Sequence, residues 1–125
     1  MATIRVTNFI EAQQAGNEIA RAGRAQARTY DTDEENPNAS GGIVEIGTTY
    51  AQLDVSSDIT AAGYAYFENL DDTNFIEVGL EVGAAFEPMI QLDPGHSAIL
   101  PLSTTAVFAQ ADTAAAQLRY LVLER

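Results

Sequence analysis

The chain has 125 residues, of which 46% are hydrophobic, and it contains no cysteine. This length suits a single hydrophobic core, and the lack of cysteine excludes both a disulfide framework and a thiolate metal site. No apolar run approaches the roughly 18 to 20 residues of a membrane-spanning helix, and the first residues lack the pattern of an export signal, so we expect a soluble protein with no membrane partner.

The charge is distributed unevenly along the chain, although it sums to −12. Four of the six arginines, Arg5, Arg21, Arg24 and Arg28, lie near the N-terminus, where only two glutamates accompany them. Residues 29–117 contain fifteen Asp or Glu residues and no Arg or Lys. Such an acidic body repels phosphate groups, which argues against a nucleic-acid partner. We expect the basic segment to dock on the acidic body of a neighbouring copy or on another acidic protein; the alternative is that its arginines are solvated and the acidity only maintains solubility.

The first 30 residues are predicted to form an N-terminal arm. Residues 3–10 alternate apolar and polar side chains, which predicts a strand. Residues 11–28 are rich in Ala, Gln, Glu and Arg, which favours a helix, but two glycines in that segment would each cost about 1 kcal/mol in a helix interior. Its apolar residues are mostly alanines, too small to anchor a helix on a core. We therefore predict an extended, strand-like arm over Ile19–Tyr30, with a short helix as the alternative.

Residues 31–42 (DTDEENPNASGG) contain no large apolar residue and are predicted to form an exposed acidic loop. Several of their side chains could offer oxygen ligands to a calcium ion: Asp31, Asp33, Glu34, Glu35 and Asn36. Their order lacks the ligand spacing and the terminal bidentate Glu of an EF-hand. A solvated loop is therefore favoured, and we predict neither a metal nor another cofactor.

Residues 43–125 are predicted to form the body of the protein. Short strands are expected at 43–46 and 50–55, and further strands follow from residue 63 onward. Three of these place apolar residues on one face at a period of two: Ile76, Val78 and Leu80; Phe86, Ile90 and Leu92; Leu118, Tyr120 and Val122. Residues with turn chemistry separate the strands at 71–72, 93–95 and 112–113.

This strand spacing predicts an all-β fold, an antiparallel β-sandwich resembling a jelly roll, with about eight strands in a single domain. Pro88 and Pro101 lie in strand-like runs, and because proline cannot donate to a ladder, they are expected on edge strands, at bulges or at strand ends. Residues 117–125 contain no such breaker and are predicted to form a central strand. Gly79 and Gly83 are interpreted as positions of a bulge or a close backbone contact.

No catalytic constellation is present in the sequence. A cupin-type metal site needs two or three histidines, and a serine hydrolase needs a histidine base beside a nucleophile elbow, whereas His96 is the sole histidine. We interpret His96 as a turn residue and predict that the protein is not an enzyme. Aromatic residues such as Tyr66 could form a sugar-stacking face, but their alternation with polar residues favours a position in the core.

Three segments carry a resemblance to a known group of proteins: GYAYFENLDDTNFIEVGL (63–80), FEPMIQLDPGHSAILPLS (86–103) and VFAQADTAAAQLRYLVLER (107–125). They resemble small virion structural proteins of tailed bacteriophages, as does the preceding IGTTYAQLDV; residues 1–42 lie outside the resemblance. The matching positions are Asn69, Leu70, Asp71, Thr73, Asn74, Leu92, Pro94, Gly95, Ala111, Thr113, Ala114 and Tyr120.

The resemblance implies an all-β virion component without a catalytic role. With a basic arm on a compact body, it favours a capsid decoration (cement) protein that is assembled in the host cytoplasm and lies on the capsid exterior. Its expected partners are the major capsid protein and other copies of itself, as a dimer or trimer. A tail or head-tail (neck) accessory protein is the alternative, and a host-carbohydrate-binding module is a third. The interface candidates are Arg5, Arg21, Arg24, Arg28, Tyr66 and Asp71.

Overall fold

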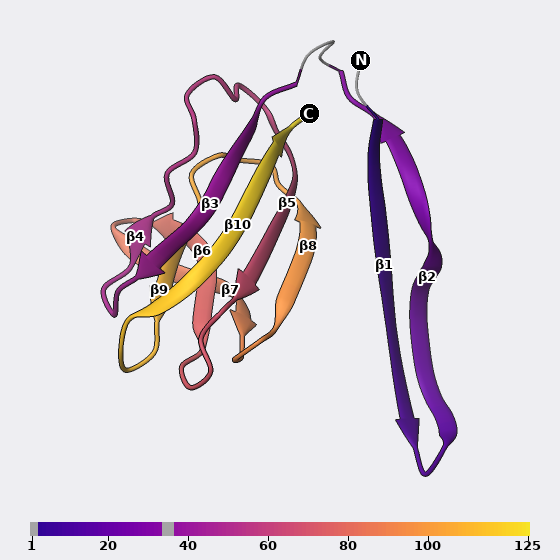
Figure 1. Cartoon of the computed structure of the whole chain (residues 1–125). Helices are drawn as coiled ribbons and strands as arrows, with labels where there is room; N and C mark the ends of the chain where they lie inside the picture. Colours follow the sequence, from indigo (N-terminus) through magenta and orange to yellow (C-terminus); the bar gives the residue numbers. More distant parts are fainter. Residues whose placement is uncertain (1–2, 34–36) are drawn as a thin grey trace. The chain divides into compact units, whose positions relative to one another are not determined.

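The computed structural model describes residues 3–33 and 37–125, and these residues form ten strands and no helix (Figure 1). The all-β fold predicted from the sequence is therefore confirmed. Among the described segments there is accordingly no helix able to span a membrane. The chain divides into two compact units, Met1–Asn36 and Pro37–Arg125, so the division falls within the predicted acidic loop. We call strands β1 and β2 of the first unit the arm, and the second unit the body.

The arm is an antiparallel hairpin of β1 (Thr3–Gln14) and β2 (Asn17–Asp31). The predicted strand at 3–10 is confirmed and continues for four more residues, and the predicted strand-like structure of Ile19–Tyr30 is confirmed over the helical alternative. Ala15 and Gly16 connect the strands with φ angles of 52° and 81°. Positive φ at both loop residues is the geometry of a type I′ turn, whose twist matches that of the paired strands.

The body is built from two four-stranded antiparallel sheets. The first has the order β3-β10-β5-β8, and the second has the order β4-β9-β6-β7 (Figure 1). The bounds are β3 Ala39–Ile46, β4 Ala51–Gln52, β5 Ala62–Asn69, β6 Ile76–Val82, β7 Ala85–Leu92, β8 Ser97–Pro101, β9 Phe108–Ala111 and β10 Ala116–Glu124. As predicted, the C-terminal strand β10 is central, between β3 and β5, and both prolines lie on edge strands, Pro88 in β7 and Pro101 at the end of β8.

The core lies between the two sheets, which form a β-sandwich. Both sheets contribute side chains that are fully or almost fully buried, including Phe67, Leu118 and Val122 from the first sheet and Ile76 and Val78 from the second. These residues alternate with exposed ones along each strand, because successive side chains of a strand point to opposite faces of its sheet.

Three of the predicted core positions, Leu80, Phe86 and Ile90, are only half-buried. The β6–β7 register shifts between Val78 and Gly79, as predicted for a bulge, and Met89 is the extra residue of β7. The shift therefore turns Phe86 away from the face of Ile90 and Leu92, whereas Leu80 keeps its phase on β6. Gly79 is required there, since a Cβ atom at this position would lie 2.1 Å from the Glu87 carbonyl oxygen. Gly83 lies in the β6–β7 turn with a φ of 58°.

Two predicted boundaries are wrong. Strand β3 begins at Ala39, not at residue 43, so the last part of the predicted loop 31–42 is paired with β10. The predicted strand 50–55 is reduced to Ala51–Gln52, and Leu53 beyond it is buried in the core. Glycine-rich and acidic composition alone therefore does not distinguish a loop from a strand whose partner is distant in the sequence.

Candidate interaction surfaces

The described residues hold no group of three or more His, Asp or Glu side chains that could bind a metal ion. Of the acidic loop, Glu34, Glu35 and Asn36 lie outside the described residues. Asp31 accepts a hydrogen bond from Thr3 Oγ1 at 3.2 Å. His96 is exposed in the β7–β8 turn, where its backbone N–H donates to the Asp93 carbonyl at 2.9 Å, which agrees with the predicted turn.

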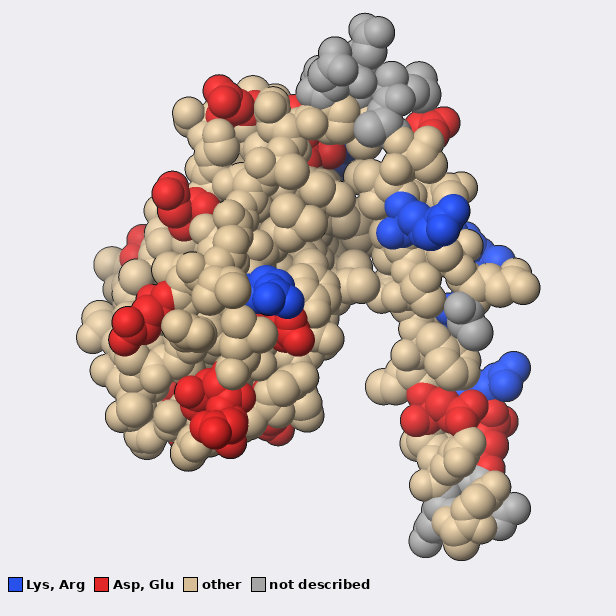
Figure 2. Space-filling view, in the orientation of Figure 1, with Lys and Arg blue, Asp and Glu red and all other residues tan. Residues whose placement is uncertain are grey.

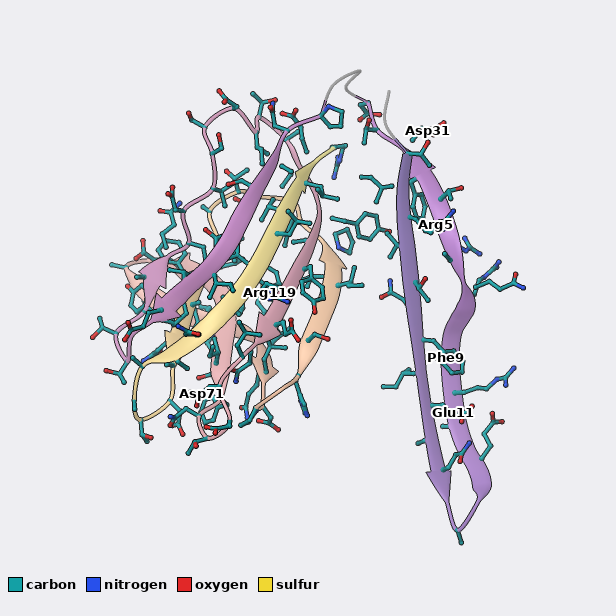
Figure 3. All side chains as sticks on the ribbon, in the orientation of Figure 1. Arg5, Phe9, Glu11, Asp31, Asp71 and Arg119 are labelled. Atoms are coloured by element: carbon teal, nitrogen blue, oxygen red, sulfur yellow. The ribbon has the colours of Figure 1, made fainter. Side chains whose placement is uncertain are left out.

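The four arginines of the arm lie on both of its faces. Arg28 is paired with Val6 and Arg24 with Asn8, so these two arginines share the face of the even-numbered residues of β1. Arg5 is paired with Thr29 and Arg21 with Glu11, on the opposite face. Arg5, Glu11 and Asp31 are labelled along the arm in Figure 3. The hairpin thus separates four arginines that the sequence suggested as one group.

Among the described residues, Arg21 is the one arginine of the arm that forms an ion pair. Arg21 forms an ion pair with Glu18 at 3.5 Å, and both side chains are exposed, a setting in which such pairs contribute little to stability. Arg24 and Arg28 line a hollow of about 260 Å³ together with Val6, Asn8, Gly23, Gln26 and Tyr30. Because a guanidinium group recognises carboxylates through paired hydrogen bonds, this hollow suits an acidic partner.

The body is strongly acidic, whereas β1 and β2 carry four arginines and three carboxylates. Residues 37–125 contain twelve Asp or Glu side chains and two arginines, Arg119 and Arg125. Figure 2 shows carboxylates spread over the visible face of the body and arginines gathered on the arm. Arg119 is paired with Glu68 at 3.4 Å. Acidic surfaces of this kind attract basic groups, with a strength that falls as salt screens the charges.

Tyr66 lies on the outer face of the first sheet, half-buried in β5. Its neighbours across the sheet are Leu121 on β10 and Ile99 on β8. Burial, followed by the nearby Glu68 carboxylate, raises the pKa of the Tyr66 hydroxyl above its ordinary value. The ring is thus one member of an apolar row rather than an isolated aromatic platform.

Asp71, the second body candidate, has a role within its own loop between β5 and β6 (Figure 3). Its Oδ2 atom accepts hydrogen bonds from the backbone N–H groups of Thr73 at 3.1 Å and Asn74 at 2.6 Å. These donors stabilise the ionised form and lower the pKa of Asp71. The carboxylate shapes the turn, in the manner typical of Asp in tight loops.

Asn69 is a structural residue whose importance the sequence did not reveal. It is completely buried, and its Nδ2 donates to the carbonyls of Asn74 at 2.8 Å and Leu92 at 2.9 Å, while Oδ1 accepts from the Asp71 N–H at 2.9 Å. Thr113 Oγ1 in turn donates to Asn74 Oδ1 at 2.8 Å. Residues that carry the resemblance are thus joined into one network that connects three loops, and this gives them a structural role.

Glu124 is the other residue that was missed. It is buried, and its carboxylate accepts hydrogen bonds from the backbone N–H groups of Asn38 and Thr60, each at 3.1 Å. These bonds lower the pKa of Glu124 and attach the start of β3 and the loop before β5 to the last strand. The sequence pattern does indicate this burial, because Glu124 continues, at a period of two, the inward-facing series of Tyr120 and Val122.

The fold and these surfaces define an all-β sandwich with a separate strand ribbon that holds four of the six arginines. No family model, no curated protein and no solved structure matches the chain. The residues themselves therefore provide the basis for a functional proposal.

Proposed function

We propose that this protein is a structural component of a tailed-phage virion, namely a capsid decoration protein that binds the major capsid protein and neighbouring copies on the outside of the head. The sequence resemblance introduces this class of protein. The arm is the observation that carries the proposal, because its construction calls for a binding partner.

Val6 is the one described apolar side chain of β1 and β2 that is buried, so the arm has no extended core of its own. A two-stranded hairpin is at best marginally stable in water, since it has no second layer on which to bury its apolar side chains. Ile10 is nevertheless 71% exposed, and Phe9 is exposed as well. A ribbon of 12- and 15-residue strands with exposed apolar side chains and unpaired outer edges is suited to lie against another protein.

The body supports the same proposal. We interpret its strand orders, β3-β10-β5-β8 and β4-β9-β6-β7, as those of a jelly roll with two Greek keys. This architecture recurs in viral capsid and lectin domains, although a fold by itself does not establish a function. The surfaces described above consist of an acidic body, a basic arm and an apolar row, which are features of binding rather than of catalysis.

Reinforcement of a shell by such a protein follows from mass action. Each copy contributes a modest contact area, and binding to the assembled shell stabilises that state over the dissociated one. A copy that contacts both the shell and its neighbours binds more tightly, because once the first contact has formed, the second forms at a high effective concentration.

Copy number tests this proposal. Densitometry of purified particles should give hundreds of copies of the chain per particle, and removal of the protein should lower the temperature at which the heads release DNA. A count of about a dozen or fewer would contradict capsid decoration and support the tail or neck alternative, because an accessory protein there forms a single ring. Absence from purified particles would reject the virion class altogether.

A further inference from the structure

The carboxylates of the arm and two of its arginines lie on opposite faces. Glu11, Glu18 and Asp31 are all on the face of the odd-numbered residues of β1, as the pairing of β1 with β2 shows. Arg24 and Arg28 are on the other face, which carries no carboxylate among the described residues. The two strands are thus close to neutral as a whole, but this face, which we call the basic face, carries two positive charges.

A bulge in β2 brings these two arginines together. Val6 and Asn8, two residues apart on β1, are paired with Arg28 and Arg24, which are four residues apart on β2. Residues 25–27 of β2 therefore face a single residue of β1. The two arginine Cα atoms are consequently about 7 Å apart along the ribbon, instead of the roughly 14 Å of a regular strand. Bulges commonly redirect side chains in this way beside functional sites.

Gly23 holds β2 close to β1 at one end of this bulge. Its φ angle is 89°, in the left-handed region that favours glycine. A Cβ atom at Gly23 would overlap the carbonyl oxygen of Asn8, so no other residue type fits without a shift of the backbone. The position of the neighbouring Arg24 is therefore set by the backbone of the ribbon.

The two arginines line the hollow of about 260 Å³ together with Val6, Gln26 and Tyr30. This volume is below the roughly 300 to 1,000 Å³ of pockets for drug-sized ligands, so the hollow suits one small group such as an acidic side chain. The guanidinium groups and the Gln26 carboxamide provide N–H donors, and Val6 gives the hollow an apolar, buried element.

The chemistry of the basic face favours a carboxylate over a phosphate polymer. Two guanidinium groups this close repel each other, and an anion between them removes the repulsion while it accepts their hydrogen bonds. A nucleic acid would bring a dense row of phosphates to a chain whose residues 37–125 contain twelve carboxylates and two arginines. A single acidic side chain brings far less charge.

The apolar surface beside the hollow indicates what carries the carboxylate. Ile10 lies on the basic face, one pair beyond Asn8 and Arg24, and is 71% exposed. Its partner Ala22 is small and leaves the Ile10 side chain accessible. An extended peptide places alternate side chains on one face at about 7 Å intervals, so an acidic residue in the hollow is followed by an apolar residue near Ile10.

We propose that the hollow between Arg24 and Arg28 is a binding site for a carboxylate side chain, presented by an extended segment of a partner protein in which acidic and apolar residues alternate. Both guanidinium groups donate to the carboxylate, and Ile10 contacts the next apolar side chain. This inference goes beyond the proposed function, because it defines the group that the arm recognises and does not depend on the capsid.

Fluorescence anisotropy of a labelled short peptide with alternating glutamate and leucine residues, titrated with the full-length protein, tests the site. The peptide should bind saturably, and its glutamine counterpart should not. Arg24→Gln and Arg28→Gln should each raise the Kd by about tenfold or more, because each removes charge-assisted hydrogen bonds. Arg24→Lys should recover part of the affinity, since lysine keeps the charge but lacks the planar fork that binds a carboxylate through two bonds.

Arg5→Gln is the matched control. It removes the same charge from the opposite face of the arm, where Arg5 is exposed and paired with Thr29, and it should leave the Kd within about twofold of wild type. Ile10→Ser should weaken binding of the leucine-containing peptide but not of a peptide with serine in place of leucine.

Backbone amide NMR spectra guard against a folding defect in the variants. The peptide should shift the amides of Asn8, Arg24 and Arg28 in the wild-type protein and leave those of β5 and β10 unchanged. In the variants, the same spectra should retain the dispersed signals of β1 and β2, so that lost binding reports the site.

Equal binding of the glutamate and glutamine peptides, or an Arg5→Gln effect as large as that of Arg24→Gln, would overturn the site. So would displacement of the peptide by a single-stranded oligonucleotide at lower concentration, or self-association that Arg24→Gln abolishes in a protein that binds no peptide, which would assign the hollow to a second copy. Peptide binding by a chain that is absent from particles would reject the proposed function alone, whereas hundreds of copies per particle without peptide binding would reject the site alone.

Discussion

The arm and the body use the same sequence pattern with different results. Both alternate apolar and polar residues, and both form antiparallel strands, but only the body stacks two sheets and buries side chains such as Phe67 and Leu118 completely. In the arm, the apolar residues Phe9 and Ile10 stay exposed. Alternation therefore determines the strand, whereas a second layer is needed to convert the strand into a stable unit.

The largest expected difference between the two regions comes from removing a phenylalanine. Phe67→Ala should lower the free energy of unfolding of the body by about 3 to 5 kcal/mol, since it leaves a cavity in the core. Phe9→Ala in the arm should change that free energy by less than about 0.5 kcal/mol. Urea titration followed by circular dichroism measures both, and equal losses would contradict the separation into two units.

Removal of the Asn69 amide should have the next largest effect. Asn69→Ala leaves the buried carbonyl of Leu92 and the Asp71 N–H without their hydrogen-bond partner, at a cost of about 2 to 4 kcal/mol. Gln91→Ala is the control, because its only described side-chain bond, to Asp93, is exposed. Thermal unfolding should separate the two variants by several degrees; similar melting temperatures would remove the role of the Asn69 network.

The body should also lose stability in acid through Glu124. Its pKa is lower in the folded state than the ordinary value of 4.5, so the folded state binds this proton less readily than the unfolded state does. The resulting stabilisation is present above pH 4.5 and is lost as the pH falls below it, toward the folded-state pKa. Glu124→Gln should therefore weaken the dependence of the urea midpoint on pH between about 6 and 3. An unchanged slope in the variant would contradict the assigned bonds to Asn38 and Thr60.

The smallest effect on folding, but a clear one on association, is expected for the arginines. Replacing Arg21, Arg24 and Arg28 together with Gln should leave the unfolding of the body within about 0.5 kcal/mol of wild type. It should weaken self-association and particle occupancy, and raised salt should reproduce this change in the wild-type protein. Unaltered occupancy in the triple variant would mean that the charge difference between arm and body has no role in binding.

Sequence patterns predict the body well because its strands follow a strict period of two, as Leu118, Tyr120 and Val122 illustrate. The hairpin turn was missed because Ala15-Gly16 lacks the Asn-Gly signature of a type I′ loop. The start of β3 was missed because glycines such as Gly41 are typical of loops. Its lack of a Cβ atom instead allows close approach to Tyr120, whose carbonyl oxygen would lie 2.1 Å from such an atom.

The interaction surfaces were less predictable than the fold. Charge counts identify the arginines, but only the register of β1 with β2 divides them between two faces. Likewise, Tyr66 became part of a surface only once β5 was placed between β8 and β10. Pairing between distant segments determines which exposed residues become neighbours, and a single sequence does not specify that pairing.

Amide hydrogen exchange, measured across a dilution series, tests most directly whether the arm depends on a partner while the body does not. The amides of β1 and β2 should exchange rapidly in dilute protein and become protected as copies associate, whereas the amides of β5, β6 and β10 should stay protected at every concentration. Equal protection of the arm at the lowest concentration, where the chain is monomeric, would contradict this account.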